Sequence, residues 1–412
     1  MNERAGQQTE TSRHEDALGH VVVLAVAVVT WWFLRSQVLQ AYPVRTPSME
    51  PTIEGDAEHP DLVLVDKTFD DRSSPQRFDT VVFREWDGDK ILVKRVVGLP
   101  GEYLQIRGFD LWTGASPNAL HRVVKSPIEH ADLLIDYWNS HRDPQGLLSN
   151  LWRHDGASTL AENRLVIEGG ARTADSLFPK DRFRRVGIDR TTAWRTAWQL
   201  DWQDGDILIG YLDASGTRRA STPSAIDFGV RMRVRATDST SLWIDLRYGD
   251  SSWALRYEAS GTVRLLANAS EAIEPRDAPA LDRDRDLVFM RLDGGFVLAV
   301  DDAIVFRHET ELLDVREMPG RVSTWNGLGI GVTGPSVSIE SVSVVLDMHY
   351  LEQGAYGVHE AHPIPGDAIY VLGDNSRDSR DSRHMGSVGL ADLVGRPLAI
   401  LAPSGRRHFL AR

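Results

Sequence analysis

Apolar residues gather in one N-terminal segment before the chain changes to another pattern. Residues 1–16 are polar, whereas residues 17–35 are almost entirely apolar and carry Trp31 and Trp32 near their end. This length lies at the short end for membrane-spanning helices, and tryptophan favours the membrane–water interface. Acidic residues precede the segment, which is atypical of a cleaved signal peptide. We therefore expect a disordered polar tail followed by a retained transmembrane anchor.

Short apolar runs after this segment predict β-strands in two regions that lie far apart in the chain. Two of the runs flank an Asp-Gly-Asp sequence at 87–89, which suits a hairpin turn. The runs are residues 62–65, 80–83, 91–93, 368–372 and 398–401. We assign residues 36–110 and 351–412 to two parts of one β core.

The region between these parts has a different pattern of apolar and polar residues, which predicts an inserted β-sandwich. Val230, Met232 and Val234 alternate with arginines, and further alternating strands follow without a helical period. We expect residues 225–350 to form an antiparallel sandwich, and residues 111–224 to be linker-like and mixed β. The predicted fold class is mostly β, with an N-terminal anchor helix and a β core that a large insertion interrupts.

Composition narrows the possible functions. A chain of 412 residues predicts about two or three domains. The formal net charge is -13 and no basic block is present, so nucleic acid is an unsuitable partner. Cysteine is absent, which excludes disulfides, thiolate metal sites and a cysteine nucleophile.

A serine near two prolines is the first candidate for chemistry. Ser48 lies in residues 46–52 (TPSMEPT). Each proline fixes its own φ and restricts the preceding residue, so the Ser48 backbone N–H is held rigidly enough to serve as an oxyanion donor. On turn chemistry alone, the same segment is more typical of an ordinary turn.

Lys94 is the second candidate. On a strand it shares a face with Leu92 and Val96, where loss of hydration lowers the pKa of an amine from about 10.4 toward neutrality. A lysine base must be uncharged to take a proton from serine. Alternation does not single out Lys94, because Arg95 lies on an equally apolar face. A surface lysine with its stem along apolar residues is the commoner case.

A third segment, residues 373–383 (GDNSRDSRDSR), is too dense in small and charged residues for a core strand. A solvated loop with surface ion pairs is one interpretation, and such pairs contribute only about 0–1 kcal/mol each. The other interpretation is a polar network that supports catalytic side chains.

Together, and in this order behind one apolar segment, the three motifs resemble those of the type I signal peptidase family. The resemblance covers about 15–110 and 363–405. The matching segments are Pro47-Ser48-Met49 with Pro51-Thr52, Lys94-Arg95-Val96-Val97-Gly98-Leu99-Pro100-Gly101, Gly373-Asp374-Asn375, and Ser379-Arg380-Asp381-Ser382-Arg383.

The resemblance implies a serine endopeptidase with Ser48 as nucleophile and Lys94 as general base, without a cofactor or metal. It implies an oxyanion hole formed by the Ser48 N–H and the Thr46 hydroxyl, and a role for Ser379 in orienting the Lys94 amine. It also implies two ion pairs that support the site without taking part in the chemistry, namely Asp381 with Arg383 and Asp374 with Arg95.

Two positions depart from the family pattern. Ser376 separates the Gly-Asp-Asn start from Arg377, where the family has arginine directly. Phe78 replaces the glycine of an Arg-Gly-Asp turn. We therefore expect this turn not to need a glycine backbone conformation in this protein.

The family implies substrates and a location. The substrates would be secretory precursor proteins with small residues before the cleaved bond, recognised as an added strand at the bilayer surface. The location would be the cytoplasmic (inner) membrane, with one span and the catalytic part on the extracytoplasmic side. Charge does not fix the orientation, because two arginines lie on each side of the apolar segment.

Residues 225–350 resemble a concanavalin-like or laminin-G sandwich, so a glycan or peptide ligand of the insertion is conceivable. Asp282, Asp284 and Asp286 offer oxygen ligands for calcium, yet the arginines between them argue against a cation site. His359 and His362 are too isolated to indicate zinc.

Two alternatives remain open from the sequence. A self-cleaving, repressor-like protease shares the Ser–Lys pair, although the apolar segment and the Leu-Pro-Gly after the lysine strand disfavour it. A membrane-tethered protein that binds a glycan or peptide, with its protease half only a scaffold, belongs to another class. The presence of both Ser48 and Lys94 argues against that interpretation.

Overall fold

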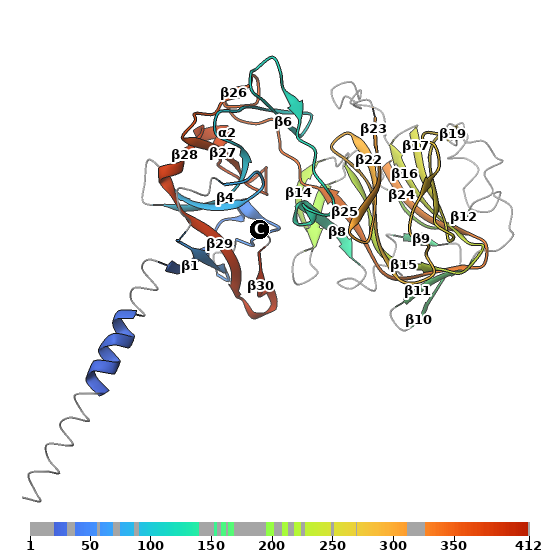
Figure 1. Ribbon diagram of the computed structural model, residues 1–412, viewed down its shortest axis with the longest axis horizontal. Coiled ribbons are helices and arrows are strands. Elements are labelled where there is room, and N and C mark those ends of the chain that lie inside the picture. Colours follow the sequence, from blue (N-terminus) through green and yellow to red (C-terminus); the bar gives the residue numbers. More distant parts are fainter. Residues whose placement is uncertain are drawn as a thin grey trace, which may run out of the picture. The chain divides into compact units, whose positions relative to one another are not determined.

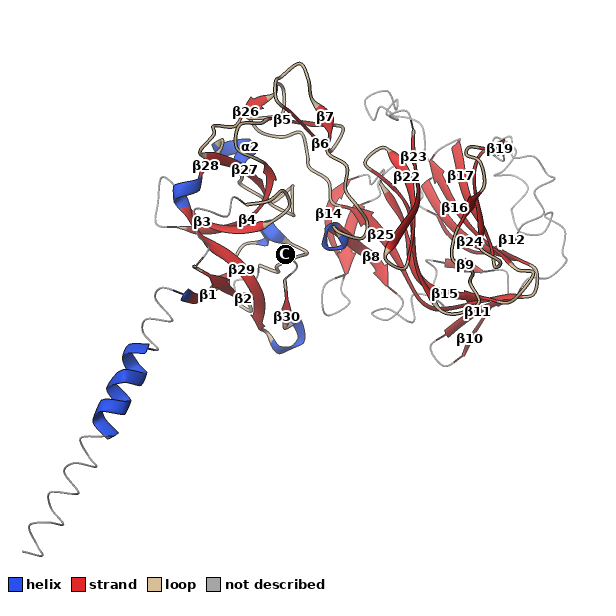
Figure 2. Cartoon of the chain, viewed as in Figure 1, coloured by secondary structure: helices blue, strands red, loops and turns tan. Residues whose placement is uncertain are grey.

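A computed structural model of the chain consists mostly of short β-strands, as the sequence predicts (Figures 1 and 2). Two compact units are present. Unit 1 comprises Met1–Gly101, Ile364–Gly373 and Arg380–Arg412, and unit 2 comprises Glu102–Pro363 and Asp374–Ser379. The residues that the structure describes are 20–30, 38–55, 58–68, 75–85, 90–139, 152–154, 158–161, 164–168, 195–201, 208–212, 218–223, 227–248, 251–268, 270–310 and 326–410.

An α-helix occupies residues 20–30, within the predicted anchor (Figure 1). The predicted tail at 1–16 and the remainder of the 17–35 segment lie outside the described residues. Within the described part of the chain, no helix is long and apolar enough to span a bilayer.

Unit 1 is built on an antiparallel sheet in the order β1-β2-β29-β3-β4-β27-β28, with β30 beside β29. Strand β29 comes from the C-terminal part of the chain and lies between β2 and β3, so the two parts of the core share one sheet. Its elements are β1 (Leu39–Val44), η2 (Pro47–Met49), β2 (Asp61–Asp66), β3 (Thr80–Arg84), β4 (Ile91–Gly98), β27 (Ala368–Leu372), α2 (Ser382–Met385), β28 (Val388–Gly389), η6 (Leu390–Asp392), β29 (Leu393–Ala402), η7 (Ser404–Arg406) and β30 (His408–Phe409).

The central strands of unit 1 are buried on both faces, which explains their continuous apolar runs. All five residues of β27 are buried, as are the last six of β4. Successive residues of β3 point to opposite faces, so Val81 and Val82 belong to different hydrophobic clusters. The strands predicted at 62–65, 80–83, 91–93, 368–372 and 398–401 are all confirmed.

Unit 2 contains two large antiparallel sheets, in the orders β10-β11-β25-β15-β21-β22-β23 and β19-β18-β17-β16-β24-β12-β9. Alternate residues of β15 (Phe228–Ala236) and β16 (Ser241–Tyr248) are fully buried, as in Val230, Met232, Leu242 and Ile244. The alternation that predicted these strands therefore marks the residues that fill the core of the unit.

The other strands of unit 2 include a small sheet in the order β26-β5-β6-β7 and the hairpin β13-β14. The elements are β5 (Tyr103–Arg107), β6 (Asp110–Gly114), β7 (His121–Arg122), η3 (Ala131–Leu133), β8 (Leu134–Asn139), β9 (Trp152–His154), β10 (Ser158–Ala161), β11 (Arg164–Glu168), β12 (Arg195–Asp201), β13 (Leu208–Leu212), β14 (Arg218–Pro223), β17 (Ser251–Glu258), β18 (Thr262–Ala267), β19 (Ser270–Glu271), β20 (Arg276–Asp277), β21 (Arg285–Leu292), β22 (Gly295–Val300), β23 (Ala303–Glu309), β24 (Asn326–Thr333), β25 (Ser336–Asp347) and β26 (His362–Pro363).

Candidate active site

Ser48 lies in a single 3-10 turn, which begins at Pro47 and packs into the core through Met49. Pro47 is the first residue of η2, and Thr46 before it is extended, as expected for a residue that precedes proline. The Glu50 N–H donates to the Pro47 carbonyl at 3.1 Å and closes the turn. Met49 is fully buried in the core of unit 1, so the turn is anchored directly beside the serine. Ser48 itself is 6% exposed.

Gly55 packs closely against the backbone at the start of this turn. A β carbon at position 55 would lie 1.8 Å from the Thr46 carbonyl oxygen and 2.7 Å from the Pro47 nitrogen. No side chain fits there, because both contacts are with backbone atoms. The sequence analysis did not single out Gly55, although a glycine shortly after a proline-rich turn is a signal of close backbone approach.

Lys94 lies on β4, opposite Val81 of β3, and is 2% exposed. Its Nζ donates to Ser48 Oγ at 2.6 Å and to the Val93 carbonyl at 2.9 Å. The structure therefore brings together the two residues that the sequence singled out, across 46 positions of the chain. Their catalytic roles stay predictions.

Thr46 lies at the exposed side of the serine. Its Oγ1 is 3.4 Å from Ser48 Oγ, at the long end of hydrogen-bond distance. The N–H of Ser48 belongs to the first turn of a helix, where backbone amides have no partner within the helix. Both groups proposed for the oxyanion hole thus come from the same rigid segment as the nucleophile.

Asp381 and Arg383 form a buried ion pair, and both side chains are 0% exposed. Arg383 Nε and Nη2 donate to the two carboxylate oxygens of Asp381 at 2.9 and 2.8 Å. Asp381 also accepts the Gly373 N–H at 3.0 Å and caps helix α2 by accepting the Arg383 N–H at 3.2 Å. The structure therefore contains the predicted Asp381–Arg383 pair, which joins α2 to the end of β27.

Ser379 is buried, and its hydroxyl has no hydrogen-bond partner among the described residues. Its predicted hydrogen bond to Lys94 Nζ is therefore not observed in this structure, and its orienting role stays a prediction. Asp374 and Arg95 are both buried, and the ion pair predicted between them also stays a prediction. Arg95 Nη1 donates to the Phe78 carbonyl at 2.8 Å.

The turn at Phe78 corrects one expectation from the sequence. Phe78 has a φ of 74°, in the left-handed region that favours glycine, so the turn does require a glycine-like backbone conformation. The phenylalanine is tolerated because its side chain is buried and its backbone is bonded at both ends. Its N–H donates to Val96 O at 2.7 Å, and its carbonyl accepts from Arg95.

Ser376, the other departure, has a structural role within unit 2. Its hydroxyl accepts the Leu351 N–H at 2.8 Å, so it satisfies a buried backbone donor. No local sequence pattern reveals this contact, since the two residues are 25 positions apart.

The structure contains a second ion pair, between Arg406 and Asp61, which the sequence analysis did not predict. Arg406 Nε and Nη2 donate to the buried Asp61 carboxylate at 3.1 and 2.9 Å, and Arg406 also pairs with Glu54. Asp61 accepts the Glu54 N–H at 2.8 Å. This network ties the segment after Ser48 to the C-terminal part of the chain. A separation of 345 residues explains why no local pattern revealed it.

The aspartates at 282–286 pair with arginines in the structure. Asp286 lies 3.4 Å from Arg233, and Asp282 lies 3.9 Å from Arg285. Both carboxylates are largely exposed, with side-chain exposures of 64% and 68%. A guanidinium group therefore lies beside each of these two carboxylates.

Comparison with known proteins finds a family that matches two segments of the chain. Residues 17–127 and 335–402 match the model of a family described as signal peptidase, peptidase S26. Both segments of the split core are included. The split core thus resembles the signal peptidase family, peptidase S26, and an insertion of more than 200 residues separates the two matched segments.

The chain is 36% identical over 91 residues to signal peptidase I V of Bacillus subtilis (strain 168), which is 22% of this chain and 48% of that protein. The chain thus spans about half the length of the curated relative that it matches.

Solved structures similar to this chain are galectin-like and concanavalin-like β-sandwiches. The laminarinase from Rhodothermus marinus covers 52% of this chain and 98% of its own, with 10% identity and a TM-score of 0.32. The Emp46p carbohydrate recognition domain covers 48% of this chain and 90% of its own, with 10% identity and a TM-score of 0.28. The galectin LEC-6 of Caenorhabditis elegans covers 30% and 92%, with 16% identity and a TM-score of 0.21.

Proposed function

We propose that this protein is a membrane-bound serine endopeptidase with a Ser48/Lys94 dyad, which removes N-terminal signal peptides from exported precursor proteins. The observation that carries the proposal is the 2.6 Å distance between Lys94 Nζ and Ser48 Oγ, both on buried side chains. A nucleophile within hydrogen-bond reach of its base is the geometry that nucleophilic catalysis requires.

The reaction begins when Ser48 Oγ attacks the carbonyl carbon of the scissile bond and Lys94 Nζ takes the hydroxyl proton. The amine must be uncharged for this step, and its removal from water disfavours the ammonium form. Lys94 then passes the proton to the leaving amine, and the C–N bond breaks to give an acyl-enzyme on Ser48. Water, deprotonated by the same amine, attacks the ester and releases the new carboxyl terminus.

The negative charge on the tetrahedral intermediate needs donors that are already in place. The Ser48 N–H and the Thr46 hydroxyl flank the nucleophile and come from one proline-fixed segment. Loss of one such donor typically raises the barrier by about 2.7–4 kcal/mol. The buried Asp381–Arg383 pair, with the proposed Asp374–Arg95 pair, supports the strands around the site and takes no part in proton transfer.

The match to the family model supports the proposed substrate and location. Family relatives act on precursor proteins, so we propose secretory precursors with small residues before the cleaved bond as substrates. Thirteen residues separate Leu34 from Ser48, so the site lies within about 45 Å of the apolar segment even with that chain fully extended. With 17–35 as anchor in the cytoplasmic membrane, the extracytoplasmic site works at the bilayer surface.

The test is cleavage of a synthetic precursor by the full chain in detergent or vesicles. Ser48→Ala and Lys94→Met should each abolish cleavage, whereas Lys90→Met should cleave like the parent, because Lys90 is an exposed lysine on the same hairpin. Equal activity of all four proteins would refute the dyad. If the parent protein cleaves none of the precursors that have small residues before the bond, the peptidase assignment is refuted.

A further inference from the structure

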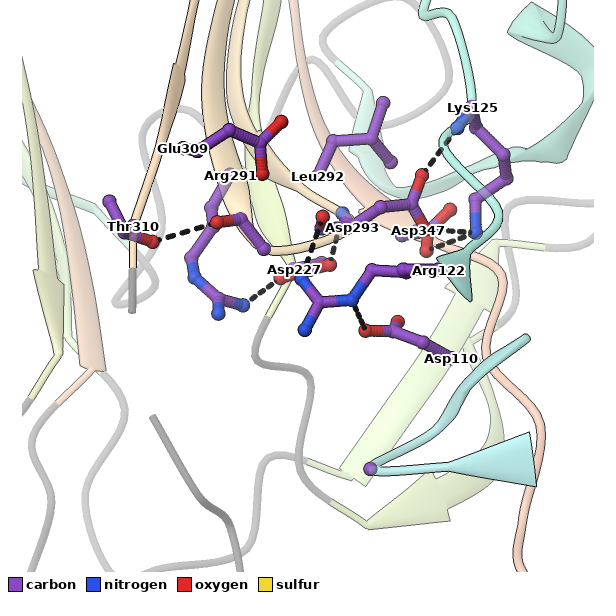
Figure 3. A network of polar contacts seen from close by, with 12 residues as sticks. Asp110, Arg122, Lys125, Asp227, Arg291, Leu292, Asp293, Glu309, Thr310 and Asp347 are labelled. Carbon is purple, nitrogen blue, oxygen red and sulfur yellow. Dashed lines mark hydrogen bonds and ion pairs between the residues drawn. The ribbon is translucent and has the colours of Figure 1, made fainter. Parts of the chain in front are cut away.

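Four aspartates converge inside unit 2, whereas the dyad belongs to unit 1. They are Asp110, Asp227, Asp293 and Asp347, and each offers a carboxylate oxygen within 4.8 Å of the others (Figure 3). All four are nearly or fully buried, and Asp110 is the most exposed at 8%. We call these four residues, together with Lys125, Arg122 and Arg291, which contact them, the root cluster.

The root cluster joins the β6–β7 segment to three strands of one large sheet. Asp110 starts β6 and Lys125 follows β7, both outside the large sheets, whereas Asp347 ends β25, which lies beside β15 in one of them. These three residues lie in the segments that match the peptidase family. Asp227 and Asp293 lie between the matched segments, at the start of β15 and after β21. The cluster is therefore a contact between family-matched strands and inserted strands.

Lys125 supplies the central cation of the cluster. Its Nζ lies 2.6 Å from Asp293 Oδ1 and 2.9 Å from Asp347 Oδ2, and its backbone N–H donates to Asp293 Oδ2 at 2.6 Å. An ammonium group thus stands where a metal ion would bring these carboxylates together. Figure 3 shows the lysine side chain reaching across to both carboxylates.

Two arginines on the other sides of the cluster offset part of the remaining negative charge. Arg122 Nε lies 3.1 Å from Asp110, and Arg291 pairs with Asp227, which also accepts the Asp293 N–H at 2.6 Å. Among the residues that the structure describes, three cations therefore face four carboxylates, and one negative charge is left over. Such an excess is costly at low dielectric, and a proton is the smallest group that removes it.

The other titratable groups around the cluster do not remove this excess. Arg307 donates to the backbone carbonyls of Leu292 and Asp293, but its charge is balanced by Glu309 at 3.1 Å. Burial lowers the pKa of His349 to about 4, so that ring is uncharged at neutral pH. Burial raises the pKa of Tyr248 well above 10, so its hydroxyl stays protonated.

The direction of proton affinity agrees with this count. Burial, with repulsion from Asp227, raises the pKa of Asp110 to about 7, although Lys125 opposes the shift. Burial also raises the pKa of Asp347 well above its ordinary value. Because the carboxylates interact strongly, the extra proton belongs to the cluster, and Asp110 and Asp347 share it.

We propose that the root cluster is a proton-dependent contact that holds the β6–β7 segment to the large sheet at β25, β15 and β21. With one proton bound, the charges balance and the contact is tight. Without it, the unbalanced carboxylate weakens the contact. Unit 2 is thus more stable in mildly acidic than in alkaline surroundings.

The sign follows from linkage. The folded protein binds this proton up to about pH 7, whereas an unfolded chain with an ordinary aspartate releases it near pH 4. Between these values the folded state holds one more proton than the unfolded state. Stability therefore falls as the pH rises, and one proton corresponds to about a tenfold change in the unfolding equilibrium constant per pH unit.

The test is urea unfolding of the full chain between pH 5 and 8, followed by tryptophan fluorescence. Nine of the twelve tryptophans lie between residues 110 and 355, so the signal reports mainly on unit 2. Below pH 7, the unfolding equilibrium constant of the parent should rise nearly tenfold per pH unit, and Asp110→Asn should remove most of this rise. At pH 8, Asp110→Asn should be more stable than the parent. Asp302→Asn, the same change at an exposed turn, should follow the parent.

Infrared difference spectroscopy of the unaltered protein provides a test that does not depend on a variant folding. The carbonyl band of a protonated carboxyl group should disappear as the pH passes from 6 to 8. Absence of such a band, or parallel pH profiles for the parent and Asp110→Asn, would overturn the proposal. So would stabilisation of the parent by calcium at pH 8 that Asp110→Asn lacks, because the cluster would then be a metal site.

Discussion

Gly55 faces the carbonyl group of Thr46 so closely that a β carbon on Gly55 would lie 1.8 Å from the carbonyl oxygen. The glycine therefore sets the position of the segment that carries Ser48, although it lies seven residues beyond it. Gly55→Ala must push the Thr46–Pro47 backbone outward, because neither contact atom belongs to a flexible side chain.

We expect Gly55→Ala to lower the free energy of unfolding by about 1–3 kcal/mol, as for other overpacked sites. It should also reduce kcat by roughly a hundredfold, since a shift of about 1 Å in a nucleophile has that effect. Urea unfolding and precursor cleavage measure the two. Gly366→Ala is the matched control, because nothing lies within 4 Å of a β carbon there. Normal cleavage by Gly55→Ala would show that the turn does not depend on this contact.

Thr46 provides a test of the oxyanion hole. Its hydroxyl lies 3.4 Å from Ser48 Oγ and its side chain is exposed. Thr46→Val keeps the shape and removes the donor, so kcat should fall by about 10²–10³-fold with little change in stability. Thr46→Ser keeps the donor and should retain most of the activity. Steady-state kinetics of both variants separates the two, and equal rates for valine and threonine would exclude this hydroxyl from the oxyanion hole.

Arg383 and Asp381 are the most deeply buried ion pair of unit 1 among the described residues, at 0% exposure each. Arg383→Met leaves the Asp381 charge buried and unbalanced, and should lower the free energy of unfolding by about 3–5 kcal/mol. Arg407→Met removes an exposed arginine of the same unit and should change stability by less than about 0.5 kcal/mol. Denaturant unfolding compares them, and equal small losses would mean that the pair does not hold α2 in place.

Local patterns predicted the strands and the dyad residues, because both leave a signal within a few positions. The apolar runs of β3, β4 and β27 mark strands buried on both faces. Pro47 and Pro51 mark the rigid segment around Ser48. The order of the motifs then identified the family.

Contacts between distant segments could not be predicted in this way. Arg406 and Asp61 are 345 positions apart, and Asp110 meets Asp347 only because the insertion closes on itself. The alternation in β15 predicted a strand and its buried face, but not that Asp227, just before it, joins a charge cluster. Such partners depend on how the sheets fold together, which no single stretch of sequence records.

Phe78 adopts a backbone conformation that favours glycine, although it carries a large side chain. Its φ of 74° costs a residue with a β carbon about 1–2 kcal/mol relative to glycine. Glycine usually destabilises a protein more than alanine does, by about 0.5–1 kcal/mol, because it has more freedom in the unfolded chain. At position 78 the cost of the left-handed conformation for alanine acts in the opposite direction and is larger than this cost of glycine.

We therefore expect Phe78→Gly to be less destabilising than Phe78→Ala by about 1 kcal/mol, although both lose the buried ring. Phe83 is the control, since it is also buried, on β3, and its φ is not positive. There, Phe83→Ala should be less destabilising than Phe83→Gly. Urea unfolding of the four variants gives the two differences. If glycine is the worse substitute at both positions, the left-handed conformation of Phe78 does not exist in the folded protein.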